Sequence, residues 1–205
     1  MSNIIMVYNY NIVLNFKKHG LIHKENFFTK KQFQQIVNEC KIYHKYLKQD
    51  TRNKNRLIVI IPKKSIIYKM LYGEKSPIKL FIEKLANKKT IQPDFPVEYR
   101  MYPKGSQGMH WHSDLQLYKK AQYEVVLTVY NSSDSRLLWL DKQINKYTIK
   151  SKSNSVTIVK PNTALHKVTP LNKGFRTILK FIYIFDKEKC SNSYKNEVKH
   201  LKSFK

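Results

Sequence analysis

The residues best placed to do chemistry in this chain are two histidines and an aspartate. His112 and Asp114 are two positions apart, so on a strand their side chains point to the same side of the sheet. His166 lies 52 residues beyond Asp114 and could complete a cap of three ligands on one metal ion. Two imidazoles and one carboxylate that leave the other coordination positions open suit a non-haem Fe(II) ion.

Arg176 extends this pattern, because it follows His166 by ten residues. A fixed guanidinium there could bind the carboxylate of an acidic co-substrate. Taken alone, the His-x-Asp pair is weak evidence, since either residue could occupy an ordinary turn. The order of His-x-Asp, a β-rich stretch, His and Arg is far more restrictive. His110 shares the parity of His112 but lacks the His-x-Asp spacing, so we assign His112 as the ligand and place His110 at the pocket mouth.

Length and composition indicate one folded domain. The chain has 205 residues, of which 41% are hydrophobic and 13% aromatic, and this excludes a disordered chain. Cys40 and Cys190 are too few for a disulfide framework and lack zinc-site spacing, which favours a reducing, intracellular and cytoplasmic location. No apolar run reaches the length of a membrane span, and the stretch at 4–8 is a poor signal peptide, so we expect no membrane partner.

The formal net charge of +25 suggests an anionic partner such as nucleic acid. Of the 39 basic residues, however, 34 are lysine and 5 are arginine. Proteins that read bases favour arginine, whose planar fork matches guanine edges and phosphates. An excess of lysine is also what an AT-rich coding genome produces, so nucleic acid is treated as an alternative partner.

Hydrophobic periodicity divides the chain into a helical first part and a β-rich second part. Helical spacing of apolar residues predicts three helices, with Thr29 and Ser65 as N-caps of two and Ser76 preceding the third. Period-two alternation predicts strands from residue 96 onward. The helices are expected at 30–48, 66–71 and 77–85, and the strands at 4–16, 57–61, 97–102, 109–114, 123–130, 136–140, 145–149, 155–159, 163–168 and 175–185.

Many short strands at this spacing predict a sandwich or jelly roll, with the preceding helices packed on one sheet. The fold class is therefore α+β and β-rich. We expect a single domain over 1–205, in which 1–95 give helical support and 96–186 form the jelly-roll core. Residues 187–205 are lysine-rich and are expected to form a basic tail, either a short helix or a frayed end.

Three segments give this chain a resemblance to the Fe(II)- and 2-oxoglutarate-dependent dioxygenases, and within them to the prolyl-hydroxylase branch. They are Tyr-Pro-Lys-Gly-Ser-Gln-Gly at 102–108, His-Ser-Asp at 112–114, and His-Lys-Val-Thr-Pro at 166–170 followed by Gly-Phe-Arg at 174–176 and an apolar strand. The resemblance covers about residues 97–186. It implies a double-stranded β-helix in which His112, Asp114 and His166 hold Fe(II).

The same resemblance implies the rest of the site. Arg176 would bind the far carboxylate of 2-oxoglutarate with Tyr102 as a second donor, O2 would be the other co-substrate, and ascorbate a potential reductant. Collagen-type prolyl hydroxylases have Lys where this chain has Arg176. Nucleic-acid demethylases of the superfamily have a second Arg further along the strand, where this chain has Lys180; that lysine could face the cavity or solvent.

Other residues near the motifs have weaker assignments. Trp111 points away from His112 on a strand and is expected in the core. Glu98 and Arg100 share the parity of Tyr102, which leaves a pocket role and a rim salt bridge open. Two further residues could line the cavity from the next strand, and four histidines without partner spacing are expected at the surface. These are Thr128 and Tyr130, and His19, His23, His44 and His200.

The leading functional hypothesis is a hydroxylase that acts on a side chain of a peptide or protein, with proline as the first guess. One alternative is oxidative demethylation or hydroxylation of nucleic-acid bases. The other is a catalytically inactive jelly-roll binding module. The sequence does not indicate an oligomeric state.

Overall fold

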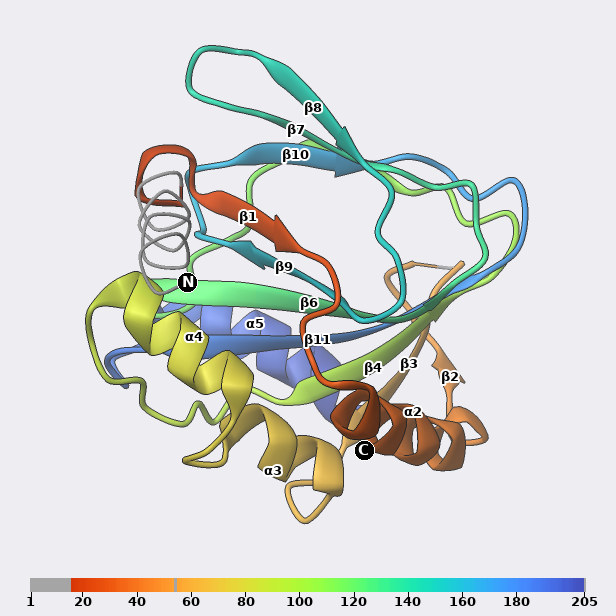
Figure 1. Ribbon diagram of the computed structural model, residues 1–205, viewed down its shortest axis with the longest axis horizontal. Helices are drawn as coiled ribbons and strands as arrows, with labels where there is room; N and C mark the ends of the chain where they lie inside the picture. Colours follow the sequence, from red (N-terminus) through yellow and green to blue (C-terminus); the bar gives the residue numbers. More distant parts are fainter. Residues whose placement is uncertain (1–15, 54, 205) are drawn as a thin grey trace, which may run out of the picture.

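The computed structural model describes residues 16–53 and 55–204, and in it two antiparallel β-sheets face each other (Figure 1). The strand predicted at 4–16 lies outside the described residues except for its last position. The larger sheet has the strand order β1-β9-β6-β11-β4-β3-β2, and the smaller sheet has the order β5-β10-β7-β8. This arrangement confirms the predicted β-rich jelly roll.

The strands of the larger sheet are β1 (Leu21–Lys24), β2 (Lys48–Gln49), β3 (Leu57–Ile61), β4 (Val97–Tyr102), β6 (Gln122–Asn131), β9 (Ser155–Val159) and β11 (Arg176–Ile184). Those of the smaller sheet are β5 (Met109–His112), β7 (Leu137–Leu140), β8 (Lys146–Ile149) and β10 (Leu165–Val168). Most predicted strands agree with these bounds, although the strand predicted at 109–114 ends at 112. The short strands β1 and β2 were not predicted, because neither has a clear apolar alternation.

Three helices cover the face of the larger sheet that points away from the smaller sheet: α2 (Lys30–His44), α3 (Ile66–Tyr72) and α4 (Pro77–Ala86) (Figure 1). The predicted caps Thr29 and Ser65 are present, since Thr29 forms a capping box with Gln32 and Ser65 accepts a bond from a backbone N–H. Ser76, expected only to precede its helix, caps it in the same way. The first helix is shorter than the predicted 30–48. The buried apolar residues between helices and sheet form the main core.

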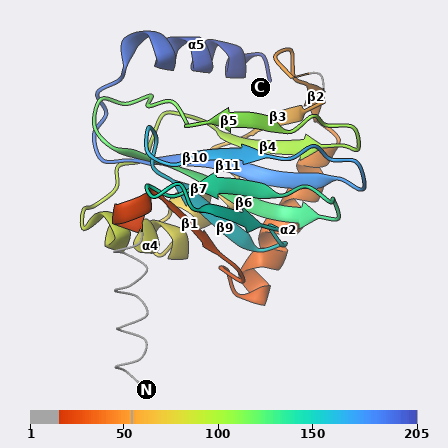
Figure 2. The ribbon, with the colours of Figure 1, turned by 90° about the horizontal axis from the view of Figure 1, so that it is seen from above.

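A fourth helix, α5 (Ser191–Lys202), lies on the other face of the larger sheet. It runs along the side of the molecule where β3 of the larger sheet and β5 of the smaller sheet lie (Figure 2). Its Leu201 is buried and packs in one cluster with Phe95, Ile182 and Ile184. The predicted basic tail is therefore a docked helix and not a frayed end. Among the described residues, no helix is long and apolar enough to cross a membrane.

Candidate metal centre

The three predicted ligands come together between the two sheets. His112 ends β5 and is paired in register with His166 on the neighbouring β10, and Asp114 follows two residues after His112. One ligand atom from each residue lies within 4.8 Å of the others. Asp114 approaches His112 Nε2 at 3.9 Å and His166 Nε2 at 3.6 Å. The strand pairing thus places residues 52 positions apart around one point.

Backbone carbonyls orient both imidazoles. The Nδ1 atom of His112 lies 2.7 Å from the carbonyl oxygen of His110, and that of His166 lies 3.0 Å from the carbonyl oxygen of Ala164. A carbonyl can only accept, so each Nδ1 must carry the proton and each Nε2 keeps a free lone pair. Burial lowers the pKa of His166, although Asp114 raises it in part, and this favours the neutral ring that a metal needs.

The chemistry of this donor set fits a divalent metal ion. His112 Nε2 is buried and has no hydrogen-bond partner among the described residues, so its lone pair is available. Two neutral imidazoles and a carboxylate on one side of an ion match the facial arrangement suited to Fe(II).

Arg176 lies at the start of β11, opposite Tyr102 of β4 in the strand register, and both residues line the same cavity as the triad. Its Nε atom is buried without a partner, and no carboxylate of the described residues forms an ion pair with it. Burial lowers the pKa of Arg176, and Tyr102 offsets this only in part. A buried guanidinium that lacks an anion fits the carboxylate of an acidic co-substrate.

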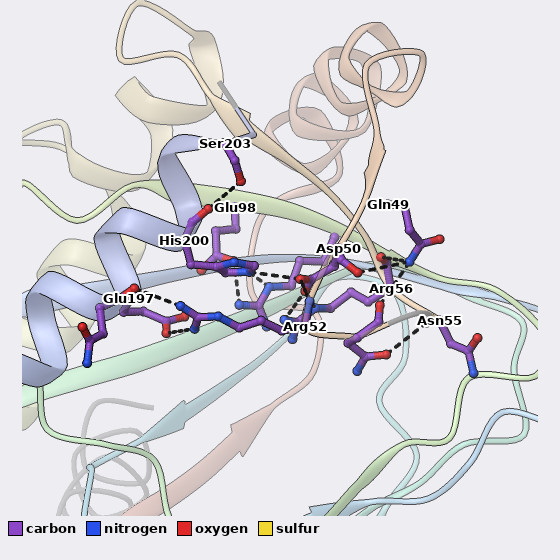
Figure 3. Close-up of polar contacts among 12 residues, drawn as sticks. Gln49, Asp50, Arg52, Asn55, Arg56, Glu98, Glu197, His200 and Ser203 are labelled. Carbon is purple, nitrogen blue, oxygen red and sulfur yellow. Dashed lines mark hydrogen bonds and ion pairs between the residues drawn. The ribbon is translucent and has the colours of Figure 1, made fainter.

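Tyr102 lies among three guanidinium groups. Burial raises the pKa of Tyr102, but the positive charges of Arg100, Arg56 and Arg176 outweigh burial, so the pKa is lowered. Arg56 is held by an ion pair with Asp50 (Figure 3). Arg56 was not predicted as part of the site, because it follows the polar turn predicted at 50–55 and nothing in its spacing relates it to Tyr102.

The same turn joins the site to α5. His200 approaches Asp50 at 3.0 Å, and Arg52 pairs with Glu197 at 2.5 Å (Figure 3). On its other side, Asn55 donates to the carbonyl oxygen of Gly105 in the loop between β4 and β5. The expectation that His200 is a surface residue was wrong, since its side chain is 7% exposed and its partner Asp50 is fully buried.

Several neighbouring assignments also change. Glu98 and Arg100 form a buried ion pair at 2.6 Å, and Arg100 lines the cavity, so neither belongs to the rim. Trp111 is 37% exposed on the edge strand β5, under Lys167 at 5.1 Å, and is not in the core. His23, expected at the surface, is partly buried and bonded to Thr157.

Two expected cavity residues lie elsewhere. Neither Thr128 nor Tyr130 lines the cavity that holds the triad. Tyr130 is exposed and stacks on Phe175 with the ring centroids 4.8 Å apart.

Comparison with known proteins reveals similarity at the level of the fold. No protein-family model matches the sequence, and no curated protein matches it. Among solved structures, the chain is similar to a prolyl 4-hydroxylase of Pseudomonas putida, with a TM-score of 0.68, 15% identity, and coverage of 88% of this chain and 99% of that one. The fold predicted from the resemblance, that of the Fe(II)- and 2-oxoglutarate-dependent oxygenases, is therefore confirmed.

Two further structures show how varied the activities of this fold are. A prolyl hydroxylase of Trichoplax adhaerens, solved with a peptide fragment of hypoxia-inducible factor, has a TM-score of 0.68 and 14% identity, and covers 87% of this chain and 89% of its own. The α-ketoglutarate-dependent epimerase SnoN has a TM-score of 0.71 and 10% identity, and the match covers 87% of this chain and 81% of SnoN. Hydroxylase and epimerase share the architecture, so the reaction must be argued from the site.

Proposed function

We propose that this chain is an Fe(II)- and 2-oxoglutarate-dependent oxygenase that hydroxylates a side chain of a peptide or protein, with proline as the first candidate. The observation that carries the proposal is one cavity that contains a His-Asp-His cluster and a buried arginine with no anionic partner among the described residues. The similarity to a prolyl hydroxylase solved with a peptide supports a peptide substrate.

His112, Asp114 and His166 would hold the Fe(II), which when bound activates O2 for attack on a C–H bond. In the overall reaction, one oxygen atom of O2 enters the substrate C–H bond as a hydroxyl and the other enters succinate, as 2-oxoglutarate loses CO2. Arg176 would bind the far carboxylate of 2-oxoglutarate through charge-assisted hydrogen bonds, and the Tyr102 hydroxyl would donate a hydrogen bond to the same carboxylate.

Tyr102 and Arg176 have complementary parts in this scheme. The guanidinium groups near the Tyr102 phenol can only donate hydrogen bonds, so the phenol proton is left to point at an incoming carboxylate. The apolar walls formed by Val168, Leu171 and Ile178 keep water from the bound acid. The protein thus orients the co-substrate before the reaction begins.

The test is turnover of a peptide library with Fe(II), ascorbate and 2-oxoglutarate. We expect peptide-dependent formation of succinate and a mass gain of one oxygen atom on one peptide residue. His112→Ala should abolish both. The matched control is His110→Ala, because His110 is exposed on the same strand and only its backbone carbonyl contacts the site. Equal loss in both variants, or no succinate from any peptide, would refute the proposal.

Nucleic acid remains the second candidate substrate, because the net charge is +25. Inside the cavity, however, Lys180 is paired with Glu124 and supplies no free cation for a phosphate. The same assay with methylated single-stranded oligonucleotides separates the two candidates. Salt-insensitive or absent binding to single strands would remove this alternative.

A further inference from the structure

A second charged pair lines the cavity, and the metal and co-substrate sites do not account for it. Lys180 on β11 and Glu124 on β6 lie 2.8 Å apart, and both line the cavity that contains the triad. Their side chains are 21% and 7% exposed. The pair is therefore enclosed within the protein while it still faces an opening.

The neighbouring positions of β11 on this face are apolar. Ile178 and Ile182, the residues on either side of Lys180 along the same face of β11, are both buried and apolar. Removing an ammonium and a carboxylate from water costs free energy, and well-packed apolar residues in place of such a pair are often as stable or more so. A role in binding explains the pair better than a role in stability.

The pair lies close to the proposed metal ligands. Asp114, Glu124 and Lys180 all line one cavity, so the pair and the proposed metal ligands share the same enclosed space. Burial lowers the pKa of Lys180, but the attraction of Glu124 outweighs burial and the pKa is raised. The lysine therefore stays charged. A substrate carbon held beside the metal would thus have this pair as a neighbour.

The two cationic positions on this face of β11 differ in kind. Lys180 is four residues beyond Arg176, about 13 Å away at the usual rise of roughly 3.3 Å per residue. Arg176 has no carboxylate partner among the described residues and suits a full anion, whereas Lys180 is neutralised by Glu124. An anionic substrate would have to displace Glu124. A neutral group with both an acceptor and a donor would satisfy the pair without displacing either residue.

We propose that Lys180 and Glu124 are specificity-determining residues that bind a neutral amide group of the substrate beside the reacting carbon. Lys180 donates to the amide carbonyl and Glu124 accepts from the amide N–H. This inference rests on the proposed function, because it assumes that a peptide reaches the metal. The amide belongs either to the substrate main chain or to an Asn or Gln side chain, and the experiment distinguishes these sources.

The experiment uses the peptide that the wild-type enzyme hydroxylates best in the library. In one series, each main-chain amide next to the reacting residue is replaced by an ester, which removes the N–H. In the other series, each Asn or Gln near that residue is replaced by Leu. We expect one replacement to raise KM for the peptide on the order of tenfold to a hundredfold, as for a hydrogen bond to a charged group.

The enzyme variant for this test is Lys180→Met combined with Glu124→Leu, which leaves no unpaired charge and so should fold. In this double variant, we expect the decisive replacement in the peptide to change KM no further. Its affinity for 2-oxoglutarate, measured by calorimetry with Ni(II) in place of Fe(II), should equal that of the wild type. Lys120→Met, which breaks the exposed pair with Asp186, is the control and should respond to the replacements as the wild type does.

The possible results distinguish a failure of the proposed function from a failure of the role assigned to Lys180 and Glu124. If no peptide supports turnover by the wild type, the proposed function fails. If peptides are turned over but no replacement changes KM, or the double variant responds as the wild type does, the assignment of Lys180 and Glu124 fails while the proposed function stands.

Discussion

The two faces of the larger sheet carry different chemistry although they belong to the same strands. Along β11, Leu179, Phe181 and Tyr183 point toward the helices and are part of the main core. The alternate residues Arg176 and Lys180 point into the cavity between the sheets. Because strand side chains alternate, a single segment contributes to stability on one face and to binding on the other.

This difference separates the effects expected from substitutions. Burial of apolar side chains on the helix-covered face contributes favourable free energy, whereas the guanidinium and ammonium groups on the cavity face are costly to bury. Changes on the first face should therefore lower stability and leave affinity for small molecules nearly unchanged. Changes on the cavity face should lower affinity for small molecules and leave stability nearly unchanged.

The largest expected effect on stability is that of Phe181→Ala. Phe181 is fully buried, with its ring centroid 6.2 Å from that of Tyr72 and 5.9 Å from that of Tyr183. Truncation should lower the free energy of unfolding by about 3–5 kcal/mol, through lost burial and the cavity left behind. Urea denaturation followed by circular dichroism measures this.

The contrast is sharpened by applying the same denaturation to the double variant Lys180→Met and Glu124→Leu. Its stability should stay within about 1 kcal/mol of the wild type or exceed it. A loss as large as that of Phe181→Ala would mean that the cavity face also holds the fold together.

A smaller effect is expected from Arg176→Met, and on binding instead of stability. Removal of the guanidinium should weaken 2-oxoglutarate binding by about 1.5–3 kcal/mol, the range for a hydrogen bond to a charged group. The free energy of unfolding should not fall, because the lost charge is buried without an anionic partner in the part of the chain that the structure describes. Calorimetric titration of the metal-loaded protein gives the affinity, and unchanged binding would contradict the assignment of Arg176.

The smallest expected effect concerns pH and the polar network around Asp50. Burial raises the pKa of Asp50, but the N–H of Arg52 and the guanidinium of Arg56 together bring it below 3.8. A carboxyl whose pKa is lowered in the folded state adds stability that is full above the unfolded value and is lost as pH falls through the folded value. Between about pH 5 and pH 3, the wild type should thus lose more stability than Asp50→Asn. If urea denaturation shows that the wild type and Asp50→Asn lose the same stability between these two pH values, Asp50 does not contribute in this way.

Local spacing was enough to predict the parts of the site that depend on single strands. His112 and Asp114 form one short motif, and the pairing of β5 with β10 brings His166 beside them, as the order of the motifs suggested. The relation of Tyr102 to Arg176 was expected from the resemblance alone, and the register of β4 with β11 places the two residues opposite each other. The N-caps Thr29 and Ser65 were readable because capping depends on residues only three apart.

The features that the sequence did not reveal depend on contacts between distant segments. Whether Lys180 faces solvent or the cavity depends on Glu124 of the adjacent strand, which no local pattern identifies. Trp111 is exposed because it points away from the cavity, onto a face of the smaller sheet that α2, α3 and α4 do not cover (Figure 1), and periodicity does not encode which face is covered. Likewise, Arg56 and His200 acquire their places from Asp50, which reads locally as an ordinary turn residue.

The network around Asp50 also sets an order of events during synthesis of the chain. Arg52 and Glu197 are 145 positions apart, so the ribosome makes the turn long before it makes α5. Until α5 emerges, Asp50 has Arg56 nearby but no imidazole from His200. The turn and the strand that carries Tyr102 are thus made first, and the wall beside Tyr102 gains its last contacts only when α5 docks.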